Sequence, residues 1–272
     1  MSESLNLQIQ GDATLPTLVY LPGLHGEWSF NFELRQAFKD RLRFVEVAYP
    51  KVDTWRLKDY PDNITRVLLD KGITAGWLLG ESFGSQVAWA MLAHAEESQR
   101  TGQPHFRPQG VILAGGFVRY PLMLGVRLVR NSHRALPLRL LMWFLKCYLR
   151  LVRLRHRRSS AAQQGLNNHY EFHNKEAAKR AILSRYDVII ESDPRALARR
   201  TQMPVYYLTG FWDIVVMWWL VQPWLKRHCP SYRGWRLVWN SEHNVLGFQP
   251  RIAAAQILAW MNVNVSGGHD RT

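Results

Sequence analysis

The sequence predicts an α/β fold, in which a doubly wound, mostly parallel sheet carries an inserted helical cap. Three observations predict it: short, continuously apolar runs recur along the chain, amphipathic segments separate them, and one long stretch interrupts this alternation. Continuous apolar runs are typical of strands buried on both faces, and strands that alternate with helices form parallel sheets covered on both sides. With 272 residues, of which 47% are hydrophobic, the chain suits one large domain with a sizeable insertion.

Seven segments have the character of strands. The first alternates between polar and apolar residues and is expected at an edge of the sheet, whereas most of the others are short apolar runs that end at glycine, proline or a polar residue. In chain order the expected strands are residues 5–10, 17–23, 43–50, 76–82, 110–118, 204–210 and 235–240.

Segments with apolar residues at three- and four-residue spacing lie between these strands and predict helices. They are residues 31–42, 62–72, 83–95, 215–227 and 250–261. Between the fifth and sixth expected strands lies a long stretch with helical patterning and no clear strand. We therefore expect a core of residues 1–118 and 203–272, with residues 119–202 as the inserted cap.

One serine stands between two glycines where an apolar strand meets a helix, in Gly80-Glu81-Ser82-Phe83-Gly84. A G-x-S-x-G pattern in this setting is typical of a nucleophile elbow, a strained turn that exposes the serine hydroxyl at the edge of the sheet. The helix that follows favours developing negative charge at its N-terminus. An ordinary turn serine is the alternative, and the strand-to-helix context favours the nucleophile.

A serine hydroxyl needs a base to take its proton, and the base needs an acid to orient it. Asp213 follows the expected strand 204–210, and His243 follows the last expected strand. Both positions lie at strand C-termini, where doubly wound sheets hold their sites, and the chain order of serine, acid and histidine is the one expected there. Asp213 could instead cap the next helix, and Glu81 and Glu242 are expected to be local polar groups.

The oxyanion of the reaction needs two hydrogen-bond donors. The backbone N–H of Phe83 is one candidate, and the glycine-rich turn 22–26 after an early strand offers the N–H of Leu24 as the other. Trp28 and Trp212 adjoin these loops in the sequence and could line an apolar acyl pocket.

Four segments together resemble the α/β-hydrolase superfamily, of the capped esterase, lipase and C–C-bond-hydrolase type. They are LPGLHGEW, GESFGS, GFWDIVV and SEHNVLG, and the resemblance covers residues 15–118 and 203–263. Pro22 stands where the family commonly has histidine, but a backbone donor does not depend on that side chain. The resemblance implies a serine hydrolase without cofactor or metal, acting on carboxylic esters of apolar or lipid-like character. A thioesterase, an acyltransferase, a C–C-bond hydrolase and a non-catalytic binding protein remain alternatives.

The chain is strongly basic, with a net charge of +14, and no Asp or Glu occurs from residue 98 to residue 170. From residue 138 the sequence predicts a basic amphipathic helix with Trp143 and Phe144 near its middle. This helix could pack its leucine face over the active site and leave its arginines in water, or it could bind an anionic membrane surface. No nucleic-acid recognition motif is present, so nucleic-acid binding is not expected.

Other features argue for a reduced, cytoplasmic setting. Cys147 and Cys229 lie far apart and fit no metal-ligand spacing. His169 and His173 share a helix face but lack the glutamate spacing of a metalloprotease, so no metal site is expected. No signal peptide and no transmembrane helix are expected, and attachment to the membrane would be peripheral.

Overall fold

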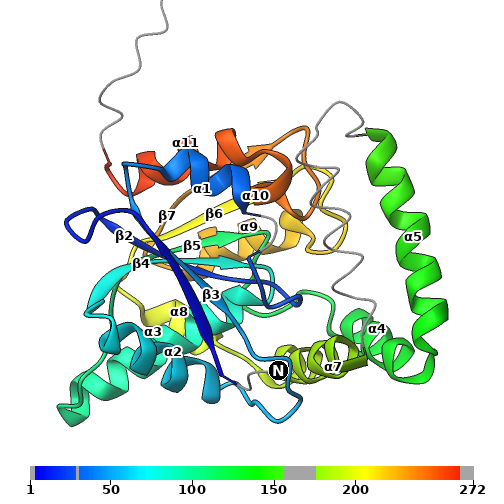
Figure 1. Ribbon diagram of the computed structural model, residues 1–272, viewed down its shortest axis with the longest axis horizontal. Helices are drawn as coiled ribbons and strands as arrows, with labels where there is room; N and C mark the ends of the chain where they lie inside the picture. The colour runs from blue at the N-terminus through cyan, green and yellow to red at the C-terminus, as the bar shows by residue number, and fades with distance from the viewer. Residues whose placement is uncertain (1–3, 29–30, 156–175, 264–272) are drawn as a thin grey trace, which may run out of the picture.

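A seven-stranded sheet forms the centre of the computed structural model, which describes residues 4–28, 31–155 and 176–263 (Figure 1). Its strand order is β1-β3-β2-β4-β5-β6-β7; β1 pairs antiparallel with β3, and all other neighbours are parallel. The strands are β1 (Asn6–Gln10), β2 (Thr17–Leu21), β3 (Arg43–Ala48), β4 (Ala75–Glu81), β5 (Arg107–Ala114), β6 (Val205–Gly210) and β7 (Tyr232–Val238).

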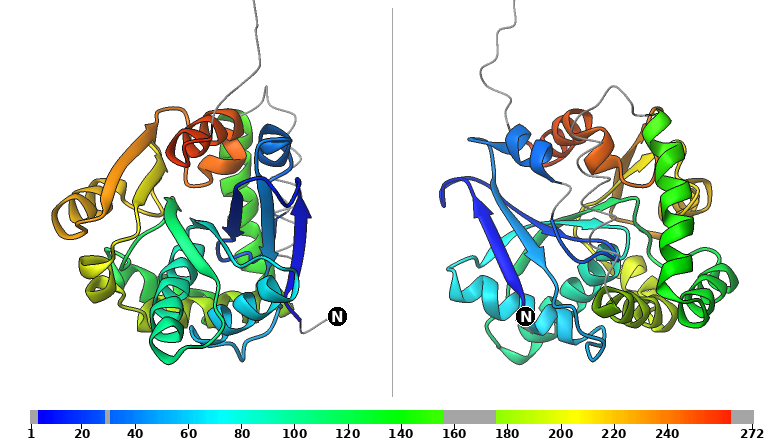
Figure 2. Two further views of the ribbon diagram at one scale, coloured as in Figure 1. Left: turned by 90° about the vertical axis from the view of Figure 1, so that its left-hand side faces the viewer. Right: turned by 45° about the vertical axis from the view of Figure 1, so that its right-hand side comes forward.

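Helices cover both faces of this sheet, as the views in Figures 1 and 2 show. One face packs against α1 (Phe32–Phe38), α10 (Val245–Phe248) and α11 (Pro250–Trp260). The other packs against α2 (Asp59–Asp70), α3 (Gly84–Thr101), α8 (Arg195–Arg200) and α9 (Trp218–His228).

The sequence of β2 shows why both faces are covered. Val19 and Leu21 belong to the larger apolar cluster on one side, while Leu18 and Tyr20 belong to the cluster on the other, and all four side chains are fully buried. Successive side chains of a strand point to opposite faces, so a continuous apolar run requires cover on both. The predicted fold class, a doubly wound, mostly parallel sheet with a helical insertion, is confirmed.

The described part of the insertion between β5 and β6 consists of helices and connecting loops and contains no strand. It contains α4 (Met123–Ala135), α5 (Leu138–Arg155) and α7 (Glu176–Glu191), followed by α8. Arg130 of α4 bonds Asp187 of α7 at 2.6 Å, and Val126 and Val188 reach the larger apolar cluster. Helix α5 stands at the edge of the molecule with α4 and α7 near its base (Figure 1).

Some element boundaries differ from the prediction for physical reasons. Strand β7 starts at Tyr232, because the sheet register pairs Tyr232 with Val205, and it ends at Val238. Helix α9 starts at Trp218, not at residue 215, because the N–H groups of Val215 and Val216 donate to the Asp213 carboxylate. The short helix α10 was not predicted.

The described residues bear on three predictions, which concern membrane-spanning helices, metal sites and the two cysteines. None of the helices in the described ranges is long and apolar enough to cross a bilayer. Within those same ranges no cluster of three His, Cys, Asp or Glu residues could hold a metal ion, whereas His169 and His173 lie outside the described residues. Cys147 and Cys229 are both free.

Candidate active site

Ser82 occupies a sharp turn between β4 and α3. Its φ of 51° lies in the left-handed region, which non-glycine residues rarely adopt and which is concentrated at functional sites. The Ser82 N–H donates to the Ala114 carbonyl at 3.0 Å, which fixes the turn to the end of β5. A Cβ on Gly84 would lie 2.0 Å from the Leu21 carbonyl oxygen, so only glycine lets α3 begin this close to β2.

His243 lies in the loop after β7 and faces Ser82. Its Nε2 atom is 2.8 Å from the Ser82 Oγ, and its Nδ1 atom is 2.8 Å from Oδ2 of Asp213. A carboxylate oxygen can only accept, so Nδ1 carries the proton and Nε2 is free to accept the serine proton. Three side chains that are distant in the sequence therefore form one line of hydrogen bonds.

Asp213 combines the two roles that its sequence position left open. Its Oδ1 atom accepts from the N–H groups of Val215 and Val216 at 3.0 and 2.8 Å, as a capping residue does, and Oδ2 remains for His243. The side chain is fully buried. The two backbone donors fix the rotation of the carboxylate and aim Oδ2 at the imidazole.

The charges around His243 favour its protonated form. Burial alone would lower the pKa of His243, but the charge of Asp213, its hydrogen bond and the charge of Glu81 together outweigh burial and raise this pKa above its ordinary value. A base with a raised pKa takes up a proton more readily. This suits a group that must receive one from a serine hydroxyl.

The turn after β2 lies beside the serine. A Cβ on Gly23 would be 3.4 Å from the Ser82 Cβ, so the glycine-rich turn approaches the nucleophile directly. Within the described residues, no backbone carbonyl accepts a hydrogen bond from the N–H of Leu24 or of Phe83. Two backbone donors beside a nucleophile are the arrangement that an oxyanion hole requires.

A buried polar network lies behind the elbow and was not predicted. The Tyr20 hydroxyl donates to the Glu81 carboxylate, so Glu81 is a local polar group as expected. Burial raises the pKa of Glu81 above its usual range, with opposing contributions from Tyr20 and His243. Nearby, Glu46 accepts from Asn31 at 3.0 Å and pairs with Arg35 at 3.0 Å.

Arg185 is a second residue that the sequence analysis missed. It belongs to α7, is 1% exposed, and donates to the carbonyl oxygen of Leu24 at 2.6 Å. A signal was available, because Arg185 lies on the apolar face of its helix, between Ile182 and Val188. A charged residue on a buried helix face needs a specific partner, here found 161 residues away.

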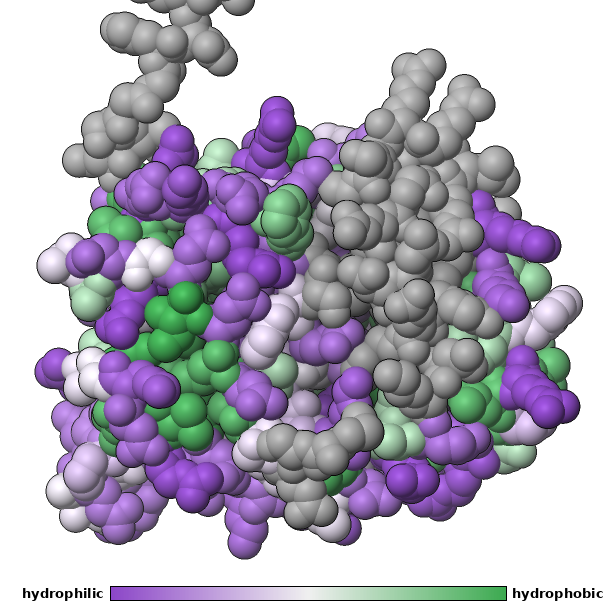
Figure 3. Space-filling view, viewed as in Figure 1, coloured by the Kyte–Doolittle hydropathy of each residue, from purple (hydrophilic) through white to green (hydrophobic). Residues whose placement is uncertain are grey.

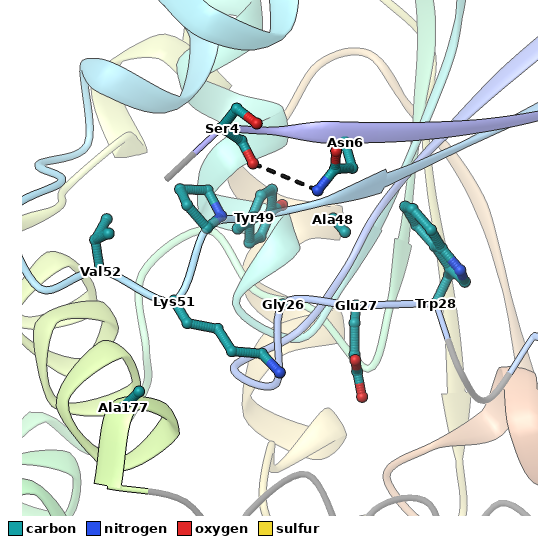
Figure 4. Close-up of a pocket in the computed structure, with 11 residues that line it drawn as sticks. Ser4, Asn6, Gly26, Glu27, Trp28, Ala48, Tyr49, Lys51, Val52 and Ala177 are labelled. Carbon is teal, nitrogen blue, oxygen red and sulfur yellow. Dashed lines mark hydrogen bonds between the residues drawn. The ribbon is translucent and has the colours of Figure 1, made fainter. Parts of the chain in front are cut away.

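The two tryptophans predicted to bind substrate lie in different surroundings. Trp28 lines a cavity of about 550 Å³ together with Gly26 and Tyr49. Figure 4 shows this cavity between the loop that carries Trp28 and the segment after β3, with Ala177 of α7 on its far side. Trp212 is half exposed and packs edge-to-face against Phe211. Among the described residues that line this cavity, Trp212 is absent.

The chain has the α/β-hydrolase fold, as comparison with solved structures shows. A hydrolase from Pseudomonas aeruginosa PA01 matches with a TM-score of 0.76 at 12% identity, over 95% of this chain and 94% of that one. The esterase RhEst1 from Rhodococcus sp. ECU1013 matches with a TM-score of 0.73 at 17% identity, over 95% and 94%. The enol-lactonase from Burkholderia xenovorans LB400 matches with a TM-score of 0.71 at 13% identity, over 95% and 96%. No protein-family model and no curated protein matches the sequence.

Proposed function

We propose that this protein is a serine hydrolase that cleaves carboxylic esters, with Ser82, His243 and Asp213 as its catalytic triad. The observation that carries the proposal is the line of hydrogen bonds from Ser82 Oγ to His243 Nε2 and from His243 Nδ1 to Asp213, both 2.8 Å long. The strained φ of Ser82 adds to it, since strain of this kind persists where function requires it.

The geometry supports a two-step reaction through an acyl-enzyme. Ser82 Oγ attacks the ester carbonyl while His243 Nε2 takes the hydroxyl proton, and Asp213 stabilises the imidazolium. The N–H groups of Leu24 and Phe83 hold the oxyanion, a contribution of about 2.7–4 kcal/mol for one such donor. His243 then gives the proton to the leaving alcohol. A water molecule next attacks the acyl group, and His243 takes its proton and returns it to Ser82 as the acid leaves.

We propose an apolar or lipid-like acyl group as the substrate class, with Trp28 and Trp212 in contact with it. Residues 119–202 would form the cap of this site, over a core of residues 1–118 and 203–272. The esterase and the enol-lactonase that share the fold support ester chemistry, since a lactone is a cyclic ester. A thioesterase, an acyltransferase or a C–C-bond hydrolase would use the same triad, and no cofactor is needed for any of them.

A panel of esters and thioesters of graded chain length tests the proposal, with Ser82→Ala as the matched control. We expect turnover of esters by the wild-type protein, with kcat/KM rising with chain length, and loss of this turnover in Ser82→Ala. Turnover of thioesters alone would favour a thioesterase. Inertness of the folded wild-type protein toward the whole panel would favour a non-catalytic binding protein.

We also propose that α4 and α5 bring the enzyme to an anionic membrane surface as a peripheral, cytoplasmic protein. Neither helix contains an acidic residue. Figure 3 shows hydrophobic and hydrophilic side chains side by side at the edge of the molecule where these helices stand. The exposed apolar side chains of these helices include Leu124, Leu128, Trp143 and Phe144, and the exposed cations include Arg127, Arg134, Arg139 and Arg150.

This mixture fits anionic lipid better than water alone. Apolar side chains can enter the interface while the arginines meet lipid phosphates, at about 1 kcal/mol per cation near the surface. Leu138, Leu141 and Leu145 of α5 face α4 and α7 across a cavity of about 320 Å³, which Phe144 also lines. Arg139, Trp143 and Arg150 of the same helix are exposed and available to a partner.

Sedimentation with vesicles tests this second proposal. We expect binding to vesicles rich in anionic lipid at low salt, and little binding to zwitterionic vesicles. Arg127→Glu combined with Arg139→Glu should weaken binding. Arg251→Glu, on the exposed surface of α11, is the control that changes charge elsewhere. The proposal would be contradicted if the double variant sedimented with anionic vesicles as well as the wild type does, or if the wild type did not sediment with them at all.

A further inference from the structure

The insertion reaches the candidate oxyanion loop through one buried arginine. Arg185 of α7 is 1% exposed, its Nη1 donates to the Leu24 carbonyl at 2.6 Å, and its Nη2 donates to the Pro50 carbonyl at 3.1 Å. Its guanidinium also lies over the ring of Tyr49, 5.5 Å from the centroid. One side chain of the insertion therefore joins the loops that follow β2 and β3.

The loop is shaped to receive this guanidinium. Gly26 has a φ of 76°, and a Cβ at this position would lie 2.6 Å from Nη1 of Arg185. The turn itself is closed by the Gly26 N–H, which donates to the Gly23 carbonyl at 3.0 Å. Only glycine meets both demands at residue 26, the left-handed backbone and the close approach of Arg185.

The cost of burying the Arg185 guanidinium favours a role for this residue beyond packing. Removing a guanidinium from water is costly, and the hydrogen bonds of Arg185 go to the carbonyls of Leu24 and Pro50 and to the Tyr60 hydroxyl, none of which carries a charge that would neutralise it. Arg130, by contrast, joins α4 to α7 through a half-buried ion pair with Asp187. That ion pair joins two helices within the insertion, whereas Arg185 connects the insertion to the turn beside Ser82.

We propose that Arg185 is a positioning residue for the oxyanion hole, an inference that rests on the proposed hydrolase function. By holding the Leu24 carbonyl, Arg185 fixes the backbone of the residue whose N–H binds the oxyanion. A misplacement of about 1 Å in such a group can cost about 100-fold in rate. The oxyanion hole is complete only when α7 is docked, so the insertion controls the rate of the chemical step as well as access to the site.

Two substitutions and one matched control test this role. Arg185→Met keeps the length of the side chain and removes both donors, whereas Arg185→Lys keeps one charged donor group. Arg130→Met removes an arginine of the insertion that bonds Asp187 and contacts neither loop. For each variant, kcat and KM on one ester are measured together with the melting temperature.

An oxyanion hole acts on the transition state, so the effect should appear in kcat. We expect Arg185→Met to lower kcat by about 10- to 100-fold with little change in KM. Arg185→Lys should recover part of this loss. Arg130→Met should keep kcat within about twofold of the wild type, since its ion pair lies outside the site.

A folded Arg185→Met with wild-type kcat would overturn the proposal, as would a loss confined to KM. Loss of the melting transition in both Arg185 variants would assign the residue a structural role and overturn it too. Failure of the proposed function would look different, because the wild-type protein would then be inactive on every ester.

Discussion

Replacing Asp213 with asparagine should stop His243 from acting as the base without disturbing the fold. The change keeps the size and shape of a fully buried side chain. Its Oδ1 atom already accepts from the N–H groups of Val215 and Val216 at 3.0 and 2.8 Å. An asparagine keeps these bonds only with its amide oxygen in that place, so its NH2 group replaces Oδ2 and faces His243.

The consequence follows from the direction of the hydrogen bonds. An amide NH2 facing Nδ1 requires Nδ1 to accept, which moves the imidazole proton to Nε2, 2.8 Å from the Ser82 Oγ. His243 then presents a proton where it should take one. The carboxylate that raises the pKa of His243 is lost as well. By analogy with serine proteases, kcat should fall about 10⁴-fold, or about 5.5 kcal/mol of barrier.

Steady-state kinetics on the best ester of the panel measures this effect. Asp12→Asn is the control, since Asp12 lies in an exposed turn where it bonds Thr14. Asp213→Asn should melt near the wild-type temperature, and the control should keep wild-type kcat. A folded Asp213→Asn that retains more than about a tenth of wild-type kcat would refute the assignment of Asp213 as the orienting acid.

Three further predictions concern pH and packing. The raised pKa of His243 predicts that kcat/KM falls as pH drops through a value above the ordinary 6.5, because the protonated imidazole cannot accept the serine proton. A pH–rate profile whose acid limb lies below 6.5 would contradict this prediction. Burial raises the pKa of Glu46 from 4.5 to about 7, although Arg35 and Asn31 oppose the shift. Between these two pH values the folded state binds more protons than the unfolded state, so the free energy of unfolding decreases as pH rises from 4.5 to about 7. Urea unfolding at both ends of this pH range measures the decrease, and Glu46→Gln should make it smaller by up to about 3 kcal/mol. An unchanged pH dependence of stability in Glu46→Gln would contradict this prediction. Gly84→Ala places a Cβ 2.0 Å from the Leu21 carbonyl, so it should destabilise the protein by about 1–3 kcal/mol and lower kcat by at least about tenfold, whereas wild-type melting and activity would show that the contact relaxes freely.

The three residues of the candidate triad could be predicted because each follows a recognisable strand. Parallel strands end at the same edge of a sheet, so polar residues just after β4, β6 and β7 are brought to one place by topology alone. Ser82 and His243 lie 161 residues apart in the sequence and 2.8 Å apart in the structure. The strands, the G-x-S-x-G pattern and the chain order of the three residues together were enough to predict that they meet.

Arg185 and the pair Tyr20–Glu81 could not be found in the same way. The contact of Arg185 with Leu24 depends on how the insertion packs on the core, and the contact of Tyr20 with Glu81 depends on the pairing of the neighbouring strands β2 and β4. No local pattern encodes either contact. Arg185 reaches Leu24 across 161 residues from a helix outside the strand alternation, and Tyr20 reaches Glu81 across 61. Sequence periodicity shows that a face is buried, but it does not show which carbonyl the face meets.

Covalent labelling with a fluorophosphonate tests the central claim most directly, because this reagent reacts with a serine hydroxyl only where a base activates it. Intact-mass spectrometry of the folded protein, followed by peptide mapping, should show one adduct on Ser82. The adduct should be absent in Ser82→Ala and form far more slowly in Asp213→Asn. A folded wild-type protein that takes up no label, or takes it up at another residue, would contradict the account.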